Sequence, residues 1–438
     1  MLSVLRHRTY RHLFAAQVIA LVGTGLATVA LSLLAYDLAG ARAGSVLGTA
    51  LAIKMLAFVA LAPLIGAYAH RLPRRLLLVG SDLIRAGAAA TLPFVTQVWQ
   101  VYLLILLLQT ASAAFTPAFQ SLIPDVLPEE REYTRALSLS SLAYDLENLF
   151  SPALAAGLLT VIGFHQLFFG TTVGFLASAT LVVSAVLPKS RRDRVPGNAF
   201  ARATHGARLF WAVPRLRALL ALNLTVAAAG AVVFVNTISY VRDHLHRATA
   251  DVPLALGAYG AGSMTAALLL PRVLDRVRER TVMLPAAALL TALLLVPLAL
   301  LTATPAPHGG GGWQWPALLA LWAATGACCA VLNAPAGRLI KRSTTRAQRA
   351  DAFAAQFSLS HSCWLLSYPL AGWLGATAGL LPAELALGAL ALAGLLAAVR
   401  IWPADDGAAR PATGLPGRPP TPWPATPVTP AGGSTAVG

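Results

Sequence analysis

Residues 13–35 read LFAAQVIALVGTGLATVALSLLA, a stretch without a single charged side chain. A helix rises about 1.5 Å per residue, so a stretch of about 20 apolar residues is long enough to cross the hydrocarbon core of a bilayer. Across the 438 residues, 57% are hydrophobic and only 11% are charged, which excludes a water-soluble globular or disordered chain. The sequence is typical of a polytopic membrane protein.

Similar stretches predict twelve transmembrane helices in two groups of six. They are expected near 12–37, 45–69, 75–96, 98–120, 137–163 and 165–187, then near 216–240, 253–273, 281–304, 313–337, 352–378 and 382–402. The fold class expected is therefore an all-α integral membrane protein with two pseudo-symmetric six-helix bundles. Four regions are predicted: a first bundle over 1–188, a basic cytoplasmic linker over 189–215, a second bundle over 216–402, and a Pro-rich disordered cytoplasmic tail over 403–438.

The formal charge of +16 is explained by membrane topology. With these spans, 28 of the 33 basic residues fall on the same side as the N-terminus, and only Arg42, Arg242 and Arg247 fall on the other side. Basic loops resist translocation, so both termini are expected in the cytoplasm, and no nucleic-acid partner is needed to explain the charge. The abundance of Arg and Ala is typical of a GC-rich bacterial genome, which indicates a bacterial inner membrane.

The two halves of the chain repeat each other. HRLPRR at His70–Arg75 and DRVRER at Asp275–Arg280 carry basic residues at the same two positions. Repeated halves around a central cleft are common in secondary transporters, where the binding site lies near the midplane. No nucleotide-binding motif is present, so we expect neither an enzyme nor a cofactor.

The segment Gly66–Arg75 resembles the signature G-x-x-x-D-R-x-G-R-R of the major facilitator superfamily, with His70 at the acidic position and Pro73 at the second glycine. The resemblance implies the major facilitator fold, with gating contacts formed by this motif and its counterpart in the second half. The residues concerned are Gly66, His70, Arg71, Arg74, Arg75, Asp275, Arg276 and Arg280.

Three further stretches, 10–14, 35–40 and 117–152, are most similar to bacterial exporters of macrolides, siderophores and nickel, with the nickel-resistance branch nearest. The function implied is proton-coupled export of a divalent metal by a monomer in the bilayer, through alternating access. The alternative is efflux of a drug, macrolide or siderophore. A transporter-like receptor or a passive channel is a third reading, disfavoured because a channel needs rings of pore-lining residues.

Charged residues inside spans are candidates for the coupling site, because burying them costs free energy. Asp145 shares one helical face with Asn148 on the fifth span, whereas Glu147 lies on another face. Asp145 is either a proton or cation site or an interfacial carboxylate. Asp37 is either a second transport carboxylate or a helix-end residue. Lys54 is either a countercharge for a cavity carboxylate or half of a fixed ion pair.

Polar residues on other spans complete the candidates. Gln17 and Gln109 either line a polar cleft or mediate helix packing. Asp82 and Arg85 are expected to form a structural ion pair near the cytoplasmic side. His361 and Cys363 have side chains that suit nickel, zinc or copper, yet two residues apart they face opposite sides of a helix, so each is either a metal ligand or a packing residue.

Overall fold

The computed structural model describes residues 2–61, 73–127, 157–185, 199–274, 276–296, 312–345 and 348–403, together with isolated positions between 129 and 155. Every regular element in these ranges is a helix. Nine helical segments among the described residues are long and apolar enough to cross a membrane. The predicted all-α membrane fold is confirmed.

Several of the observed helices follow the expected spans to within about four residues, whereas the helix expected over 281–304 ends at Leu293. The first helix group comprises α1 (Arg8–Ala39), α2 (Ala43–Leu56), α4 (Arg74–Thr91), α5 (Val98–Val126) and α7 (Phe164–Ser184). The second helix group comprises α9 (Pro214–Ala231), α11 (Asp251–Leu274), α12 (Glu279–Leu293), α14 (Gln314–Asn333), α16 (Arg349–Pro369) and α18 (Leu380–Ile401). The fifth expected span, 137–163, lies almost wholly outside the described residues.

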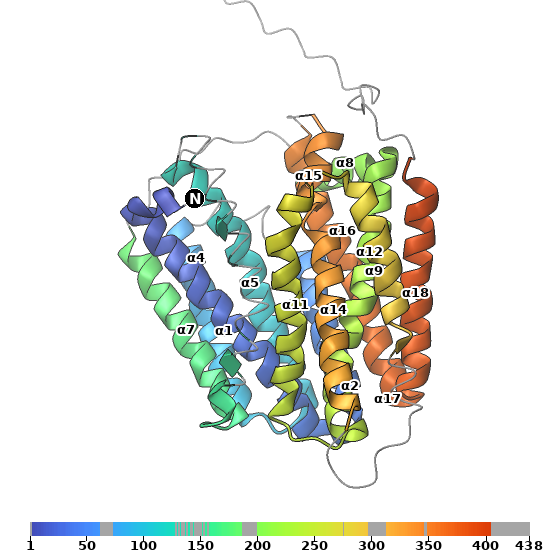
Figure 1. Cartoon of the computed structure of the whole chain (residues 1–438). Helices are drawn as coiled ribbons and strands as arrows, with labels where there is room; N and C mark the ends of the chain where they lie inside the picture. The colour runs from blue at the N-terminus through green and yellow to red at the C-terminus, as the bar shows by residue number, and fades with distance from the viewer. Residues whose placement is uncertain are drawn as a thin grey trace, which may run out of the picture.

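The two helix groups lie side by side and meet mainly through α2, which packs against α16 (Figure 1). They diverge toward the end of the molecule where the N-terminus lies and approach each other at the opposite end. We call these the inner end and the outer end. The short helices α8 (Ala199–Ala212) and α15 (Ala336–Ser343) lie at the inner end, and α8 falls within the segment expected to be a linker.

Glycine permits a close backbone approach both within the second helix group and between the two groups. A Cβ atom added to Gly262 on α11 would lie 1.8 Å from the carbonyl oxygen of Ala323 on α14. A Cβ atom added to Gly372 would lie 2.3 Å from the carbonyl oxygen of Gly44 on α2. The second contact joins the two groups, so close backbone packing closes the outer end.

Three π-helical turns interrupt the second group near the outer end. The turns η5 (Val232–Asn236) and η6 (Tyr240–His244) extend α9, with the short helix α10 (Thr237–Ser239) between them, and η7 (Leu370–Leu374) follows α16. Proline explains the third turn, because Pro369 cannot donate a backbone hydrogen bond. Single π turns inside α-helices are often found at functional sites. Their positions were not predicted from the sequence.

Candidate functional site

Polar side chains join the two helix groups at the outer end. Tyr36, near the end of α1, donates a hydrogen bond to Oδ1 of Asp243 in η6 at 2.8 Å. The guanidinium carbon of Arg242 lies 5.5 Å from the centre of the Tyr36 ring. The indole nitrogen of Trp373 donates to Oγ1 of Thr49 at 2.8 Å. These contacts join the first helix group to the second at the outer end.

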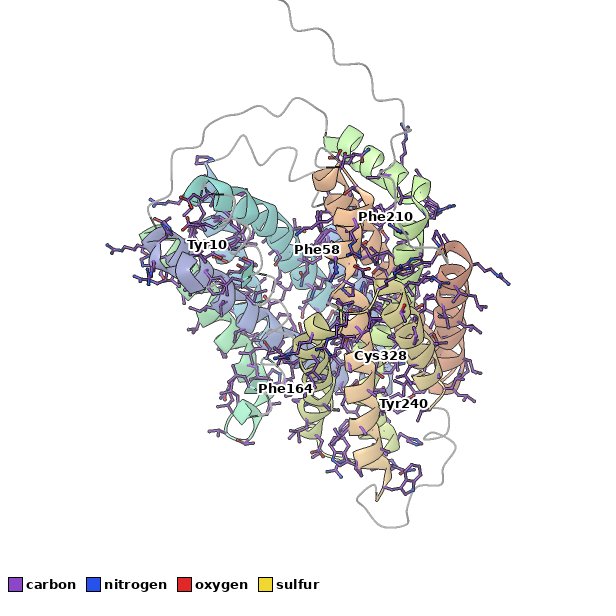
Figure 2. The ribbon with its side chains drawn as sticks, turned by 45° about the horizontal axis from the view of Figure 1, so that its top comes forward. Tyr10, Phe58, Phe164, Phe210, Tyr240 and Cys328 are labelled. Carbon is purple, nitrogen blue, oxygen red and sulfur yellow. The ribbon has the colours of Figure 1, made fainter. Side chains whose placement is uncertain are left out.

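Aromatic rings meet between the groups. Phe58, in the π turn η3 (Ala57–Leu61) that continues α2, lies 5.8 Å from Phe357 and 5.3 Å from His361, measured between ring centres. Figure 2 places Phe58 between the two groups. Both partners belong to α16, so this contact joins the second expected span to the eleventh. Lys54, one turn before Phe58, lies close enough to His361 to interact with it electrostatically.

The aromatic contacts continue along α16. Phe357, His361, Trp364 and Tyr368 are spaced by four, three and four residues, which places them on one helical face. Trp364 lies 6.2 Å from Phe234 in η5 and 5.0 Å from Tyr368. Phe234 in turn lies 5.3 Å from Tyr259 on α11. We call Phe357, His361, Trp364 and Tyr368 the aromatic face of α16. Its Phe357 and His361 rings contact Phe58 of the first group, whereas its Trp364 ring contacts Phe234 of the second.

The predicted metal ligands have other partners. Nδ1 of His361 donates to the carbonyl oxygen of Phe357 at 2.6 Å, which leaves only Nε2 able to bind a metal. The thiol of Cys363 donates to the carbonyl oxygen of Leu359 at 3.4 Å. Among the described residues, no three His, Cys, Asp or Glu side chains gather closely enough to hold a metal ion.

The other predicted polar residues are dispersed. Gln17 is buried and accepts a hydrogen bond from Ser140 of the fifth expected span at 3.0 Å. Gln109 is also buried, whereas Asp37 is exposed at the outer end of α1. Lys54 is half-buried and has interaction partners of its own. Asp145, Glu147 and Asn148 lie outside the described residues.

The gating motif is visible only in part. Gly66, His70, Arg71 and Asp275 lie outside the described residues, as does the side chain of Arg74. Arg75 donates to the carbonyl oxygen of Ala185, just past α7, while Arg276 is exposed and Arg280 is half-buried.

The sequence analysis did not identify Glu279, the acidic residue that forms ion pairs in the Asp275–Arg280 segment of the second half. Glu279 is 2% exposed and lies 2.8 Å from Nε of Arg338 and 2.8 Å from the guanidinium of Arg342, both on α15. The position of Glu279 just before a span, beside a basic run, was the available signal. The ion pairs of Glu279 join the start of α12 to α15, the short helix that follows α14 at the inner end.

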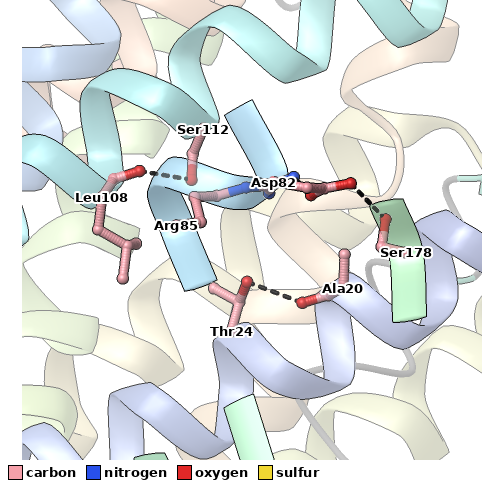
Figure 3. A network of polar contacts seen from close by, with 7 residues as sticks. All are labelled: Ala20, Thr24, Asp82, Arg85, Leu108, Ser112 and Ser178. Carbon is pink, nitrogen blue, oxygen red and sulfur yellow. Dashed lines mark hydrogen bonds and ion pairs between the residues drawn. The ribbon is translucent and has the colours of Figure 1, made fainter. Parts of the chain in front are cut away.

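The first helix group contains a buried ion pair at the middle of α4. Arg85 bonds Oδ1 of Asp82, and Ser178 on α7 donates to Oδ2 of the same carboxylate at 2.8 Å (Figure 3). The guanidinium carbon lies 4.3 Å from the ring centre of Phe115 and 4.6 Å from that of Phe175. The pair was expected near the cytoplasmic side. That placement is corrected, because α4 begins at Arg74 and Asp82 is about 12 Å further along its axis.

The second helix group contains a buried carboxyl group of a different kind. Glu384 on α18 is completely buried, and Oε1 accepts a hydrogen bond from Tyr240 in η6 at 2.9 Å. Figure 2 marks Tyr240 toward the outer end of this group. Its ring packs edge-on against Trp322, whose indole nitrogen donates to Thr237 at 2.7 Å. Glu384 was not predicted, although it is the only acidic residue in the last expected span.

Known proteins share the fold and part of the sequence. A macrolide efflux protein A of Streptococcus pyogenes is 25% identical over 182 residues, or 40% of this chain and 44% of its own length. An uncharacterised MFS-type transporter of Bacillus subtilis, YkuC, is 27% identical over 206 residues, 45% of this chain and 46% of its own length. The chain thus spans less than half the length of these curated relatives.

Solved structures agree on the architecture. A D-xylose–proton symporter superposes with a TM-score of 0.68 at 14% identity, covering 90% of this chain and 97% of the symporter. A bacterial homologue of the human lysosomal transporter Spinster, inward-facing and unoccupied, superposes with a TM-score of 0.64 at 14% identity, covering 90% and 96%. The Major Facilitator Superfamily model matches residues 13–306 and 219–431. The chain therefore belongs to the major facilitator superfamily of membrane transporters.

Proposed function

We propose that the protein exports a lipophilic organic compound across a bacterial inner membrane by alternating access, in exchange for protons. The observation that carries this proposal is the aromatic face of α16, which meets Phe58 of the first group. Aromatic rings with few fixed charges bind large apolar molecules by burial and stacking rather than by coordination. The similarity to macrolide efflux proteins supports the same class of cargo.

Nickel, the cargo favoured by the sequence resemblance, is the second candidate. A divalent metal needs several ligands with oxygen, nitrogen or sulfur atoms directed at one point. His361 has one ring nitrogen engaged with its own helix and the cationic side chain of Lys54 nearby. With one ring nitrogen engaged, and no group of three His, Cys, Asp or Glu side chains gathered among the described residues, the surroundings of His361 support the organic cargo better.

The direction of alternation follows from the outer contacts and the expected topology. With both termini in the cytoplasm, the diverging inner end of the two groups faces the cytoplasm, and the outer end is closed by Tyr36, Asp243, Thr49 and Trp373. Export then requires these contacts to break after cargo has bound from the inner side. Asp145 remains our proposed coupling carboxylate, with its protonation and cargo binding mutually exclusive.

A resistance assay tests the cargo. The full chain would be expressed in a pump-deficient, metal-sensitive bacterium, and growth would be compared on erythromycin, nickel and cobalt. We expect protection against the macrolide, reduced at least several-fold by Phe58→Ala and Phe357→Ala. Phe169→Ala, which removes a partly exposed ring on α7, is the matched control and should keep full protection. Nickel protection lost in His361→Ala, without macrolide protection, would replace this proposal by metal export.

A further inference from the structure

Glu384 occupies a site in which one of its carboxyl oxygens is satisfied and the other is not. Oε1 accepts the hydrogen bond from Tyr240, while Oε2 is buried and has no hydrogen-bond partner among the described residues. The side chain of Asn236, which is 1% exposed, lies against the same carboxyl group, and its Nδ2 also lacks a partner there. The carboxyl group therefore sits in a polar but incompletely bonded pocket of side chains.

No cation faces this carboxyl group in the described part of the chain. The elements packed around the start of α18 are α9 with η5, η7 with α17 (Gly375–Thr377), and α12. Tyr240 in η6, which continues α9 beyond η5 and α10, is the titratable side chain that touches Glu384 among the described residues. The other charged or titratable side chains on these elements and on α18 lie at their far ends or beyond Tyr240: Arg215, Arg217, Glu279, Arg280, Arg400, Arg242, Asp243 and His244.

An ionised carboxylate at such a position would be unstable. Burying a charge without a counter-ion costs free energy, and the group avoids this cost by holding a proton or by gaining access to water. Glu384 is the fifth residue of α18, about 6 Å from its outer start and about 26 Å from its inner end. Water and protons therefore have a short route to it from the outer side.

We propose that Glu384 binds a proton from the outer solution, and that this bound proton keeps the outer ends of the two helix groups together. The inference rests on the proposed function, since it supplies the outer half of the alternating cycle. The carboxylate takes up one proton as the outer end closes and releases it as the outer end opens. The ligand class is a single proton.

The hydrogen bond from Tyr240 connects this site to the contact between the groups. Tyr240 and Asp243 occupy the same π turn, and Asp243 accepts the hydrogen bond from Tyr36 of the first group. When Glu384 ionises, water must reach it, and the packing of η6 against α18 must loosen. Since Tyr240 and Asp243 lie in the same five-residue turn, we expect the Tyr36–Asp243 contact to weaken at the same time.

Infrared spectroscopy of the full-length protein in lipid membranes tests proton binding without requiring any transport. We expect a protonated-carboxyl C=O band at neutral pH that disappears in Glu384→Gln and shifts in frequency in Tyr240→Phe. Tyr10→Phe is the matched control. Tyr10 is a buried tyrosine in the first half of the chain, where it donates to the carbonyl oxygen of Ala136. If no protonated-carboxyl band of the wild type is lost in Glu384→Gln, the proposal is overturned.

Hydrogen–deuterium exchange tests the connection to the outer end. At alkaline pH, wild-type peptides covering 232–251 should exchange at least several-fold faster than those of Glu384→Gln, which keeps a neutral side chain at every pH. At neutral pH the two proteins should exchange alike. Equal exchange at both pH values overturns the link to the outer contacts. Both measurements are independent of the cargo. A protein that fails to export erythromycin would still show the infrared band of Glu384.

Discussion

Asp82 in the first helix group and Glu384 in the second are both completely buried acidic side chains within membrane spans. Asp82 is bonded by Arg85 and Ser178, and two aromatic rings flank the arginine. Glu384 accepts a hydrogen bond from Tyr240, and the Asn236 side chain lies against its carboxyl group without a well-formed hydrogen bond to Oε2. The first arrangement suits a permanent ion pair, whereas the second suits a group that gains and loses a proton.

The contrast between the two carboxyl groups indicates different roles for the two helix groups. The paired charge of Asp82 joins α4 to α7 through Ser178, so it stabilises the packing of these two helices within the first group. A buried carboxyl group without a cation among the described residues is stable only while it holds a proton, so a change in its protonation is coupled to movement of its surroundings. Replacing each partner of these two carboxyl groups in turn separates the two roles.

The largest effect is expected for Arg85→Met. The substitution leaves Asp82 as a buried charge without a cation, which costs about 3 to 5 kcal/mol of folding free energy. Unfolding of the purified protein in detergent by a denaturant would measure the loss. The double variant Asp82→Asn with Arg85→Met should lose much less than Arg85→Met alone. Equal losses in the two variants would show that the ion pair is not a unit.

A smaller effect is expected for Ser178→Ala. Its hydroxyl donates to a charged carboxylate, and a hydrogen bond to a charged group contributes about 1.5 to 3 kcal/mol. The same denaturant unfolding measures it. Thr180→Ala, a nearby exposed hydroxyl on the same helix that bonds only its own backbone, is the control and should change stability by less than about 0.5 kcal/mol.

Tyr240→Phe should lower the free energy of unfolding by less than Ser178→Ala does, because the Tyr240 hydroxyl donates to a neutral carboxyl group. An ordinary hydrogen bond contributes about 0.5 to 1.5 kcal/mol. The comparison is made by unfolding both variants under the same conditions at neutral pH. A loss in Tyr240→Phe greater than in Ser178→Ala would indicate that Glu384 is ionised and would remove the contrast between the two sites.

The smallest effect is expected for Glu384→Gln. Glutamine has nearly the shape of a protonated glutamate and carries no charge, so stability at neutral pH should change by less than about 1 kcal/mol. Asp82→Asn alone, which breaks an ion pair, is the matched acid-to-amide substitution and should cost several times more. Similar losses in the two variants would contradict the assignment of different roles.

Much of the fold was predictable because spanning a bilayer imposes a length on every apolar stretch. The first expected span, 12–37, corresponds to α1 over Arg8–Ala39, and the last, 382–402, corresponds to α18 over Leu380–Ile401. The π turns after Ala231 could not be predicted, because their sequence VVFVN is as apolar as the helix before it. The helix α8 was missed because residues 189–215 were assigned from their basic charge alone.

The candidate site was less predictable, because it depends on which helices become neighbours. The pairing of Asp82 with Arg85 followed from their spacing of three residues. The meeting of Phe58 with His361 joins residues about 300 positions apart, and no periodicity reveals it. Glu384 was passed over because it stands alone among apolar residues, yet this isolation is the reason that no cation lies beside it in the described part of the chain.

Uptake into everted membrane vesicles tests the proposed transport most directly. Vesicles carrying the full chain would be given labelled erythromycin under an imposed pH gradient with an acidic interior. We expect the compound to accumulate inside only while the gradient lasts, with a protonophore or Asp145→Asn abolishing accumulation. Accumulation of labelled nickel instead of the macrolide, or macrolide accumulation that ignores the gradient, would contradict proton-coupled export of an organic compound.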